Sequence, residues 1–453
     1  MKTIRLFRWM RAYALLLTIV MAPALRAQEG PPDFVRRAVR DVEQMLDSKG
    51  EKPVERFIEQ SMVPASDQDK RELVKVLAEI RSELRGLRDD MMVEEDPDGV
   101  RLILAGGQVV KQLKISLDFE KEAISGLTLM EGPETMDLNV DHLQQTFDQL
   151  EEEGLAGVAH VKIDGEVLVE KGFGYSNREL GHMNNLETIF GVGSRPIDFT
   201  MAAILLVDQQ GAIDLDDPIH KYFPEVPQDK QTITIRHLMS GRSGLPDFFH
   251  TPEDWDPDLA WIDRETAVMR ILHQELIFEP GKGRRHSHGA FGLLAALVEE
   301  VSGTGYYDFI REYFLDPAGM ERTGEYGESR GLQLSDFAVG GGPQQVGLPN
   351  IPPNWGPTSW LIKGSGGMYS TMGDLQKLYR YIRSGQVLDE EHRRAFLGPS
   401  INLDGSMRGF ELFSAYIPPD TEIYLFLNEM GDREKTRQLF RALERLAEPA
   451  VQE

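Results

Sequence analysis

The sequence contains no cysteine in its 453 residues. This absence excludes disulfide bonds, thiolate metal sites and a cysteine nucleophile. It also excludes a lipid-modified N-terminal cysteine as an anchor to a membrane. Thiol chemistry therefore plays no part in how this chain folds or reacts.

Basic residues are scarce relative to acidic ones, with 49 Lys and Arg against 74 Asp and Glu. The formal net charge is −25, and it becomes about −30 once the basic residues of the first 27 positions are removed. Such an acidic surface argues against nucleic acid or an anionic membrane as a partner. The simplest interpretation is that the acidity provides solubility, and the alternative is a specific cationic ligand.

Long apolar runs are missing from most of the chain, and the one near the N-terminus is short. Residues 1–27 carry a basic start, an apolar run over residues 12–24 and Leu-Arg-Ala before Gln28. This pattern predicts a secretory signal peptide, because a membrane helix needs about 20 apolar residues. We therefore expect a secreted or periplasmic protein whose mature chain does not insert stably into a membrane. An uncleaved N-terminal anchor is the alternative.

The length predicts two domains rather than one. Residues 28–130 begin with two segments that have apolar residues at helical spacing. Three strand-like runs follow, at residues 100–104, 113–119 and 124–129. This order predicts a small α+β accessory domain, and it holds no catalytic constellation. Residues 131–141 are typical of a linker, and residues 142–453 form the predicted main domain.

The main domain is organised around the stretch from Ile189 to Ile219. A short apolar run ends at Gly193, and Ser194 opens a predicted helix with a proline in its first turn. The N-terminus of a helix offers free N–H groups and the positive end of the helix dipole, which stabilise a developing alkoxide. Ser194 is therefore the candidate nucleophile.

A series of short motifs follows Ser194. They are G-A-I-D-L-D-D-P-I at residues 211–219, T-I-T-I-R-H-L-M-S-G-R-S-G-L-P at 232–246, E-P-G at 279–281, D-P-A-G-M at 316–320 and G-S-G-G-M-Y-S-T-M-G-D-L at 364–375. In this order the chain resembles the serine β-lactamase and penicillin-binding-protein superfamily, in particular the class C β-lactamase and D-alanyl-D-alanine carboxypeptidase/esterase branch. The resemblance implies an α+β fold, with an antiparallel sheet flanked by helices plus a helical cluster. It also implies acyl-serine hydrolysis of amides or esters.

The resemblance implies S-x-x-K at the start of the nucleophile helix, where the lysine lies one turn after the serine and takes its proton. This chain has Ile197 in place of that lysine, and isoleucine cannot accept a proton. One alternative is that Ser194 serves only as a helix N-cap, whose oxygen accepts a backbone N–H. Another is that Asp198 replaces the lysine, although an acid in the first helical turn is also favoured by the dipole alone.

The second family motif, Y-x-N, aligns with His286, Ser287 and His288. Histidine is a general base near neutral pH, so a dyad of Ser194 and His286 would replace both the lysine and the tyrosine. His288 is a further candidate catalytic residue. Alternatively, the two histidines lie on one face of an extended segment and share a metal ion, although no third ligand is evident. A further alternative is that both histidines are only polar loop residues at the rim of a pocket that has lost its catalytic groups.

The third family motif, H-x-G or K-T-G, aligns with Leu403, Asp404 and Gly405. Leu403 replaces the cationic or imidazole side chain, which puts recognition of a substrate carboxylate in doubt. Asp404 and Gly405 remain candidate substrate-binding residues. A strand N–H near Ser406, together with the Ser194 N–H, is the candidate oxyanion hole.

Arginines gather in segments that the resemblance places along the cleft. They are Arg195, Arg242, Arg284 and Arg285. We predict that Arg195 and Arg242 bind substrate, since guanidinium groups suit a carboxylate or phosphate. The alternative is that these arginines only balance an acidic surface.

Three altered active-site motifs within a retained scaffold favour a pseudoenzyme with a binding or regulatory role. The alternative is an active serine hydrolase of esterase, amidase or peptidase type that uses Ser194 and His286. A histidine-based metal hydrolase, sensitive to chelators, is a third hypothesis. The leading interpretation predicts no cofactor and no resident metal, with a small-molecule or peptide ligand in the cleft. The sequence does not define the oligomeric state.

Overall fold

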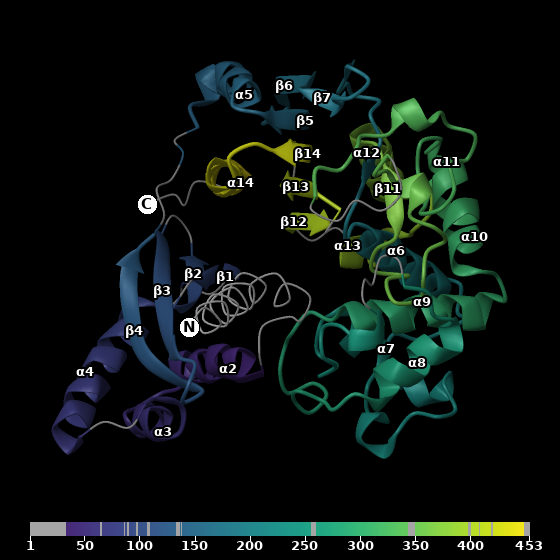
Figure 1. The fold of residues 1–453 in the computed structure, drawn as a ribbon. Coiled ribbons are helices and arrows are strands. Elements are labelled where there is room, and N and C mark those ends of the chain that lie inside the picture. The colour runs from purple at the N-terminus through teal and green to yellow at the C-terminus, as the bar shows by residue number, and fades with distance from the viewer. Residues whose placement is uncertain are drawn as a thin grey trace, which may run out of the picture. The chain divides into compact units, whose positions relative to one another are not determined.

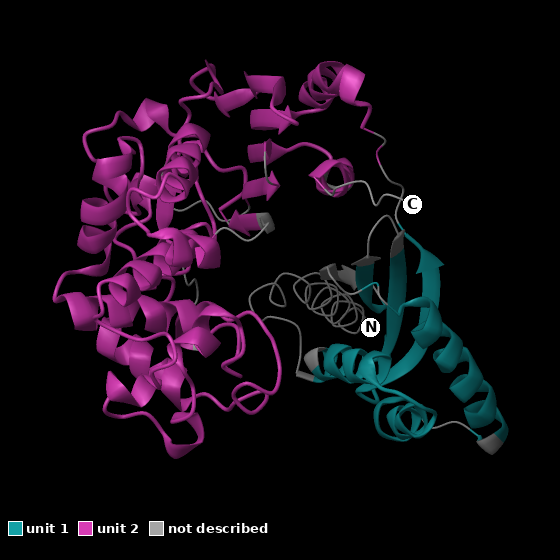
Figure 2. Ribbon diagram, turned by 180° about the vertical axis from the view of Figure 1, so that it is seen from behind, with its two compact units in different colours: residues 1–135 teal, residues 136–453 magenta. Residues whose placement is uncertain are grey.

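The computed structural model describes residues 33–63, 66–85, 87, 90–96, 98–106, 109–132, 136, 138–254, 260–342, 349–396, 400–406, 408–417 and 420–447. The predicted signal peptide, residues 1–27, lies outside the described residues. The chain forms two compact units, residues 1–135 and residues 136–453 (Figure 2). The boundary between them falls within residues 131–141, the segment predicted as a linker.

The described residues of the first unit form three helices followed by a four-stranded antiparallel sheet in the order β1-β2-β3-β4 (Figure 1). Its elements are α2 (Asp33–Asp47), α3 (Lys52–Ser61), α4 (Asp67–Glu83), β1 (Asp90–Asp96), β2 (Gly99–Gly106), β3 (Val109–Asp118) and β4 (Ala123–Glu131). Buried apolar side chains of the helices and the sheet, among them Val42, Leu102 and Ile115, form one core. The α+β prediction is confirmed, and α3 and β1 are additional to it.

The second unit is built on a five-stranded antiparallel sheet in the order β12-β13-β14-β5-β6. Its strands are β5 (Leu155–Ile163), β6 (Glu166–Phe173), β12 (Ser400–Ser406), β13 (Phe410–Ile417) and β14 (Thr421–Met430). Strands β14 and β5 pair in the middle of the sheet, with Leu425 opposite Ala159. The sheet therefore joins the beginning and the end of the unit, and β12 lies at its edge.

Helices cover both faces of this sheet. On one face, α5 (Leu143–Glu152) and α14 (Arg433–Ala447) pack through Phe147 and Leu439 (Figure 1). The opposite face belongs to a second core, which Phe426 of β14 shares with the helical cluster. The predicted antiparallel sheet flanked by helices is confirmed.

The helical cluster is centred on two packed helices, α6 (Pro196–Gln209) and α9 (His288–Ser302). Both are apolar over most of their circumference, so both are largely buried. The other helices are α7 (Ile235–Met239), α8 (Arg264–His273), α10 (Tyr306–Ile310), α11 (Asp316–Ala318), α12 (Met372–Arg383) and α13 (Glu390–Phe396), with the π-helical segment η5 (Arg311–Leu315) between α10 and α11. Among the described residues, no helix has both the length and the apolar character needed to cross a membrane.

Two small sheets complete the unit. One pairs β7 (Tyr175–Asn177) with β8 (His182–Met183), and the other has the order β10 (Gly324–Glu325), β11 (Met368–Ser370), β9 (Phe190–Gly191). The Val192 N–H also donates to the Met368 carbonyl at 3.1 Å. The glycine-rich motif at residues 364–375 therefore supplies the strand that holds the chain immediately before Ser194.

Candidate active site

Ser194 lies in a tight turn between β9 and α6. The preceding Gly193 has φ +52°, and a Cβ added there would lie 2.9 Å from the Gly405 carbonyl oxygen. Only glycine fits this position without strain, because the turn combines a positive φ with direct contact to strand β12. The sequence prediction that Ser194 opens the helix is off by one residue: the N-cap is Arg195, which has no side-chain cap.

The Ser194 hydroxyl is directed to a histidine from another part of the chain. Its Oγ lies 3.2 Å from Nε2 of His288. His288 is the first residue of α9, and Ser287 caps that helix by accepting a hydrogen bond from the Ala290 N–H at 3.1 Å. The hydroxyl is therefore not used as the helix N-cap that the sequence left open, and it lies within reach of a general base.

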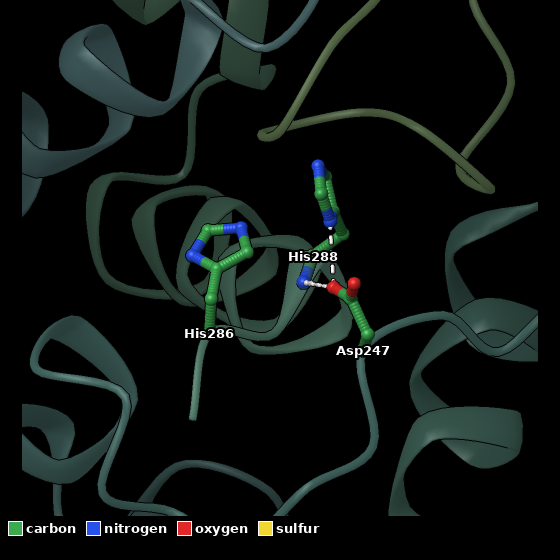
Figure 3. A group of neighbouring side chains, drawn as sticks. All are labelled: Asp247, His286 and His288. Atoms are coloured by element: carbon green, nitrogen blue, oxygen red, sulfur yellow. Dashed lines mark hydrogen bonds and ion pairs between the residues drawn. The ribbon is translucent and has the colours of Figure 1, made fainter. Parts of the chain in front are cut away.

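Asp247 lies behind His288, in the loop that follows α7 (Figure 3). Its Oδ1 accepts hydrogen bonds from Nδ1 of His288 at 2.7 Å and from the His288 backbone N–H at 3.1 Å. With the proton on Nδ1, the neutral ring keeps a free lone pair on Nε2 that faces Ser194. Burial alone would raise the pKa of Asp247, but the hydrogen bond and charge of His288 outweigh it and lower that pKa. Asp247 is thus held as a carboxylate.

His286 was the predicted base, but the hydroxyl of Ser194 is bonded to His288 instead. The centroids of the His286 and His288 rings are 4.7 Å apart, and the rings are nearly perpendicular. His288 belongs to helix α9, so the two histidines do not lie together on one extended segment as predicted. His286 also stacks on Phe291, and the pKa of His286 is lowered by desolvation and by the neighbouring His288. Its side chain makes no hydrogen bond within the described part of the chain.

Asp247, His286 and His288 can also be considered as a possible metal site. One ligand atom from each residue lies within 4.8 Å of the other two. Asp247 is thus a candidate third ligand, which the sequence alone did not indicate. The exposed ring of Phe248 covers His288 on another side, stacked at 4.5 Å between ring centroids.

Arg195 and Asp404, both predicted to bind substrate, form a buried ion pair with each other. Nε of Arg195 lies 2.6 Å from Oδ2 of Asp404, and the side chains are 5% and 6% exposed. Arg195 Nη1 also donates to Asp198 at 3.0 Å. Burial alone would lower the pKa of Arg195, but the charges of Asp198 and Asp404 outweigh it and raise that pKa. Arg195 is therefore occupied by two carboxylates, and the carboxylate of Asp198 is directed to Arg195 and not to Ser194.

Arg242 and Gly405, the other two residues predicted to bind substrate, lie nearer the surface. Arg242 is exposed, and its guanidinium donates to the Gly281 carbonyl at 2.7 Å, which ties the 241–247 loop to the segment before His286. Gly405 is exposed in β12 and contacts the nucleophile turn through its backbone. Ile197 packs against the core of the helical cluster, so the position of the family lysine is filled by an apolar side chain. The side chain of Leu403 lies outside the described residues.

The Ser194 N–H is available to a ligand, because it makes no hydrogen bond to any described residue. It lies beside β12, the edge strand of the five-stranded sheet. An edge strand leaves alternate N–H groups unpaired. The Ser194 N–H and an N–H of β12 are the two donors that an oxyanion hole would need here. That the strand donor lies near Ser406 stays a prediction.

Asp247 was missed by the sequence analysis. It directly follows the S-G-L-P motif, which in the sequence carries only the family resemblance. The available signal was chemical, because a histidine base usually needs a carboxylate to orient it. The sequence separation of Asp247 and His288 gave no spacing pattern, and only the fold brings them together.

Comparison with known proteins identifies the family. The family model described as Beta-lactamase matches residues 143–409, which is more than half of the chain. The chain belongs to the Beta-lactamase family. The match begins after the first compact unit and ends just past Ser406, so it covers every residue of the site described above.

Curated relatives of this Beta-lactamase family member are distant. The putative penicillin-binding protein PbpX of Bacillus subtilis is 24% identical over 320 residues, which cover 66% of this chain and 77% of that protein. Teichoic acid D-alanine hydrolase of Staphylococcus aureus strain MRSA252 is 26% identical over 299 residues, covering 61% of this chain and 71% of the relative. These similarities support the serine hydrolase and penicillin-binding-protein superfamily.

Solved structures show the same fold. The octameric penicillin-binding protein homologue from Pyrococcus abyssi superposes with a TM-score of 0.55 at 22% identity, covering 68% of this chain and 78% of that one. The penicillin-binding protein from Bacillus halodurans gives a TM-score of 0.53 at 22% identity, covering 66% and 99%. At this identity the likeness establishes the fold of the Beta-lactamase domain and not its reaction.

Proposed function

We propose that this protein is an active serine hydrolase that forms an acyl-enzyme on Ser194, with His288 as the base and Asp247 as the group that orients it. One observation carries the proposal. Oγ of Ser194 is 3.2 Å from Nε2 of His288, while Nδ1 of the same ring is 2.7 Å from Asp247. This is the arrangement of roles in a Ser-His-Asp triad, in which one ring nitrogen takes the proton and the other is held by the acid.

The reaction follows from these contacts. Nε2 of His288 takes the hydroxyl proton as Oγ of Ser194 attacks the carbonyl carbon of an ester or amide. The oxyanion accepts a hydrogen bond from the Ser194 N–H, and the carboxylate of Asp247 stabilises the imidazolium. Nε2–H then protonates the leaving group, and the acyl-serine forms. Water, deprotonated by the same nitrogen, releases the acid product and restores Ser194.

The missing lysine is compatible with this proposal. The sequence favoured a pseudoenzyme because Ile197 cannot take a proton from Ser194. In the triad the proton goes to His288, which occupies the position of the family asparagine, so the function of the lysine is supplied from another helix. Loss of the lysine and gain of the Asp247–His288 pair would together be an exchange of one base for another.

The relatives suggest which substrates to test first. One of them is described as a teichoic acid D-alanine hydrolase and another as a penicillin-binding protein. We propose D-alanyl esters and small D-amino acid esters as the first substrates to screen. Exposed Arg284 and Arg285 precede His286 and remain candidates for binding an acidic group of such a substrate.

The test is intact-mass analysis after exposure to a fluorophosphonate serine probe and, separately, to a penicillin. Wild-type protein, Ser194→Ala and Ser243→Ala are treated in parallel. Ser243 is a suitable control because it is a second serine in the site region and is buried. A covalent adduct on the wild type and on Ser243→Ala that disappears in Ser194→Ala supports the hydrolase. No adduct with either reagent would favour the binding or regulatory pseudoenzyme.

We propose in addition that the protein is exported. The basic and apolar pattern of residues 1–27 supports a signal peptide. Edman sequencing or mass spectrometry of protein recovered from the periplasm or medium tests this. A mature N-terminus near Gln28 is the expected result, whereas an intact N-terminus in the membrane fraction would favour the uncleaved anchor.

A further inference from the structure

His286 lies beside the Ser194–His288–Asp247 triad but has no part in its hydrogen bonds. It is exposed, and its ring nitrogens make no hydrogen bond within the described residues. Its ring faces the Asp247–His288 pair, with one nitrogen on the side towards them (Figure 3). One ligand atom each of Asp247, His286 and His288 lies within 4.8 Å of the others. His286 is therefore the member of this cluster whose ring nitrogens have no hydrogen-bond partner among the described residues.

Two imidazoles and one carboxylate are a suitable ligand set for a divalent transition-metal ion. Zn²⁺ is bound in this way in open sites that keep a fourth position for water or another ligand. Ligand atoms around a tetrahedral Zn²⁺ lie about 3.4 Å apart, given Zn–N and Zn–O bonds of about 2.0–2.1 Å. The separations of up to 4.8 Å need only a modest closure, which the exposed His286 side chain can supply by rotating.

Metal binding and base catalysis compete for His288. If the ion binds Nδ1, the single proton of the neutral ring resides on Nε2, which then donates to Ser194 instead of accepting from it. If the ion binds Nε2, it occupies the position from which the base reaches Ser194. In both cases the carboxylate of Asp247 becomes a ligand, and Ser194 loses its base.

We propose that Asp247, His286 and His288 bind one divalent transition-metal ion, such as Zn²⁺, and that this ion inhibits the hydrolase by withdrawing His288 from Ser194. The inhibition rests on the proposed function, whereas the binding does not. The triad and the metal site share two residues and differ in His286. His286 therefore determines whether a metal ion can inhibit the hydrolase.

Calorimetric titration of chelator-treated mature protein with ZnCl₂ tests the binding. Wild type and Ser194→Ala are expected to bind one Zn²⁺ per chain, and His286→Gln is expected to bind at least about tenfold more weakly because it loses a ligand. His250→Gln is the matched control, since His250 is an exposed histidine of the same region outside the cluster, and it is expected to bind as the wild type does. No binding by the wild type, or equal binding by His286→Gln, overturns the metal site.

Fluorophosphonate labelling in EDTA and in Zn²⁺ tests the inhibition. Zn²⁺ is expected to slow labelling of the wild type and of His250→Gln by at least about tenfold, and to leave His286→Gln labelled as in EDTA. Labelling that is faster in Zn²⁺, or slowed equally in His286→Gln, overturns the inhibition. A wild type that is not labelled even in EDTA refutes the serine hydrolase instead, while the calorimetric result still decides the metal site.

Discussion

One oxygen of Asp247 accepts hydrogen bonds from both Nδ1 and the backbone N–H of His288, at 2.7 and 3.1 Å. The same carboxylate thus sets the orientation of the imidazole ring and fixes the first residue of α9. The backbone bond holds the start of the helix, and the ring cannot turn away from Ser194 without breaking the bond between Nδ1 and Asp247. Nε2 is therefore held opposite Ser194 by the hydrogen bond between Nδ1 and Asp247.

Replacement Asp247→Asn is expected to abolish most activity with little loss of structure. An asparagine can still accept from the His288 N–H, but it no longer stabilises an imidazolium and can donate to Nδ1, which selects the wrong tautomer. We expect kcat to fall by roughly 10³-fold or more, the size of effect known for loss of a triad acid. Steady-state ester hydrolysis measures this, and circular dichroism checks the fold. An unchanged kcat would show that Asp247 only holds the backbone at the start of α9 and has no effect through the imidazole.

Replacement Gly193→Ala is expected to destabilise the protein and to disturb the nucleophile turn. The position has φ +52°, and the new Cβ would lie 2.9 Å from the Gly405 carbonyl oxygen. Strain of this kind costs about 1–3 kcal/mol, so the urea midpoint is expected to fall. Gly181→Ala is the matched control, because Gly181 has φ +68° but no atom within 4 Å of the added Cβ. Equal effects in both variants would contradict the proposed contact with β12.

Replacement Arg195→Ala separates a structural role from substrate binding. The change leaves the buried Asp404 and the partly buried Asp198 without their cation, and breaking a buried pair such as Arg195–Asp404 costs about 3–5 kcal/mol. Arg242→Ala, at an exposed arginine of the same region, is expected to lose much less stability. Denaturant unfolding measures both. If Arg195→Ala unfolds like the wild type but has a raised KM, Arg195 binds substrate as the sequence predicted.

Replacement Glu325→Gln is expected to stabilise the protein at neutral and higher pH. Burial raises the pKa of Glu325 to about 7 from an ordinary value of 4.5. The folded state then binds more protons than the unfolded state between these values, so stability falls as the pH rises from about 4.5 to about 7. The variant removes this loss, and we expect its melting temperature to exceed that of the wild type at pH 8 but not at pH 4. Glu321→Gln, at an exposed position, is the control, and an equal gain there would contradict a partly buried carboxyl with a raised pKa at position 325.

The fold could be predicted well from the sequence because its signals are local. Apolar spacing, turn residues and the ordered motifs located the sheet, the nucleophile helix and the α+β unit. Helix α3 was missed because its ten residues are too few for a clear periodic pattern. Strand β1 was missed because its sequence, D-M-M-V-E-E-D, is largely acidic and has no alternation of apolar residues.

The site could be predicted only in part, because its geometry depends on contacts between distant segments. The sequence indicated Ser194 and two nearby histidines, and it favoured His286 as the base, whereas the Ser194 hydroxyl lies against His288. The choice depends on where α9 begins, since Ser287 as the cap makes His288 a helical residue that is directed to Ser194. Arg195 and Asp404 were grouped with the cleft because pairing between them cannot be recognised from their separate motifs.

The most direct test of the triad is the second-order rate constant for fluorophosphonate labelling of Ser194, measured in EDTA for the wild type, His288→Gln and His286→Gln. Removal of a general base slows its reaction by about 10²–10⁴-fold. The account predicts this loss for His288→Gln and labelling near the wild-type rate for His286→Gln. A slow His286→Gln beside a normally labelled His288→Gln would make His286 the base and contradict the account.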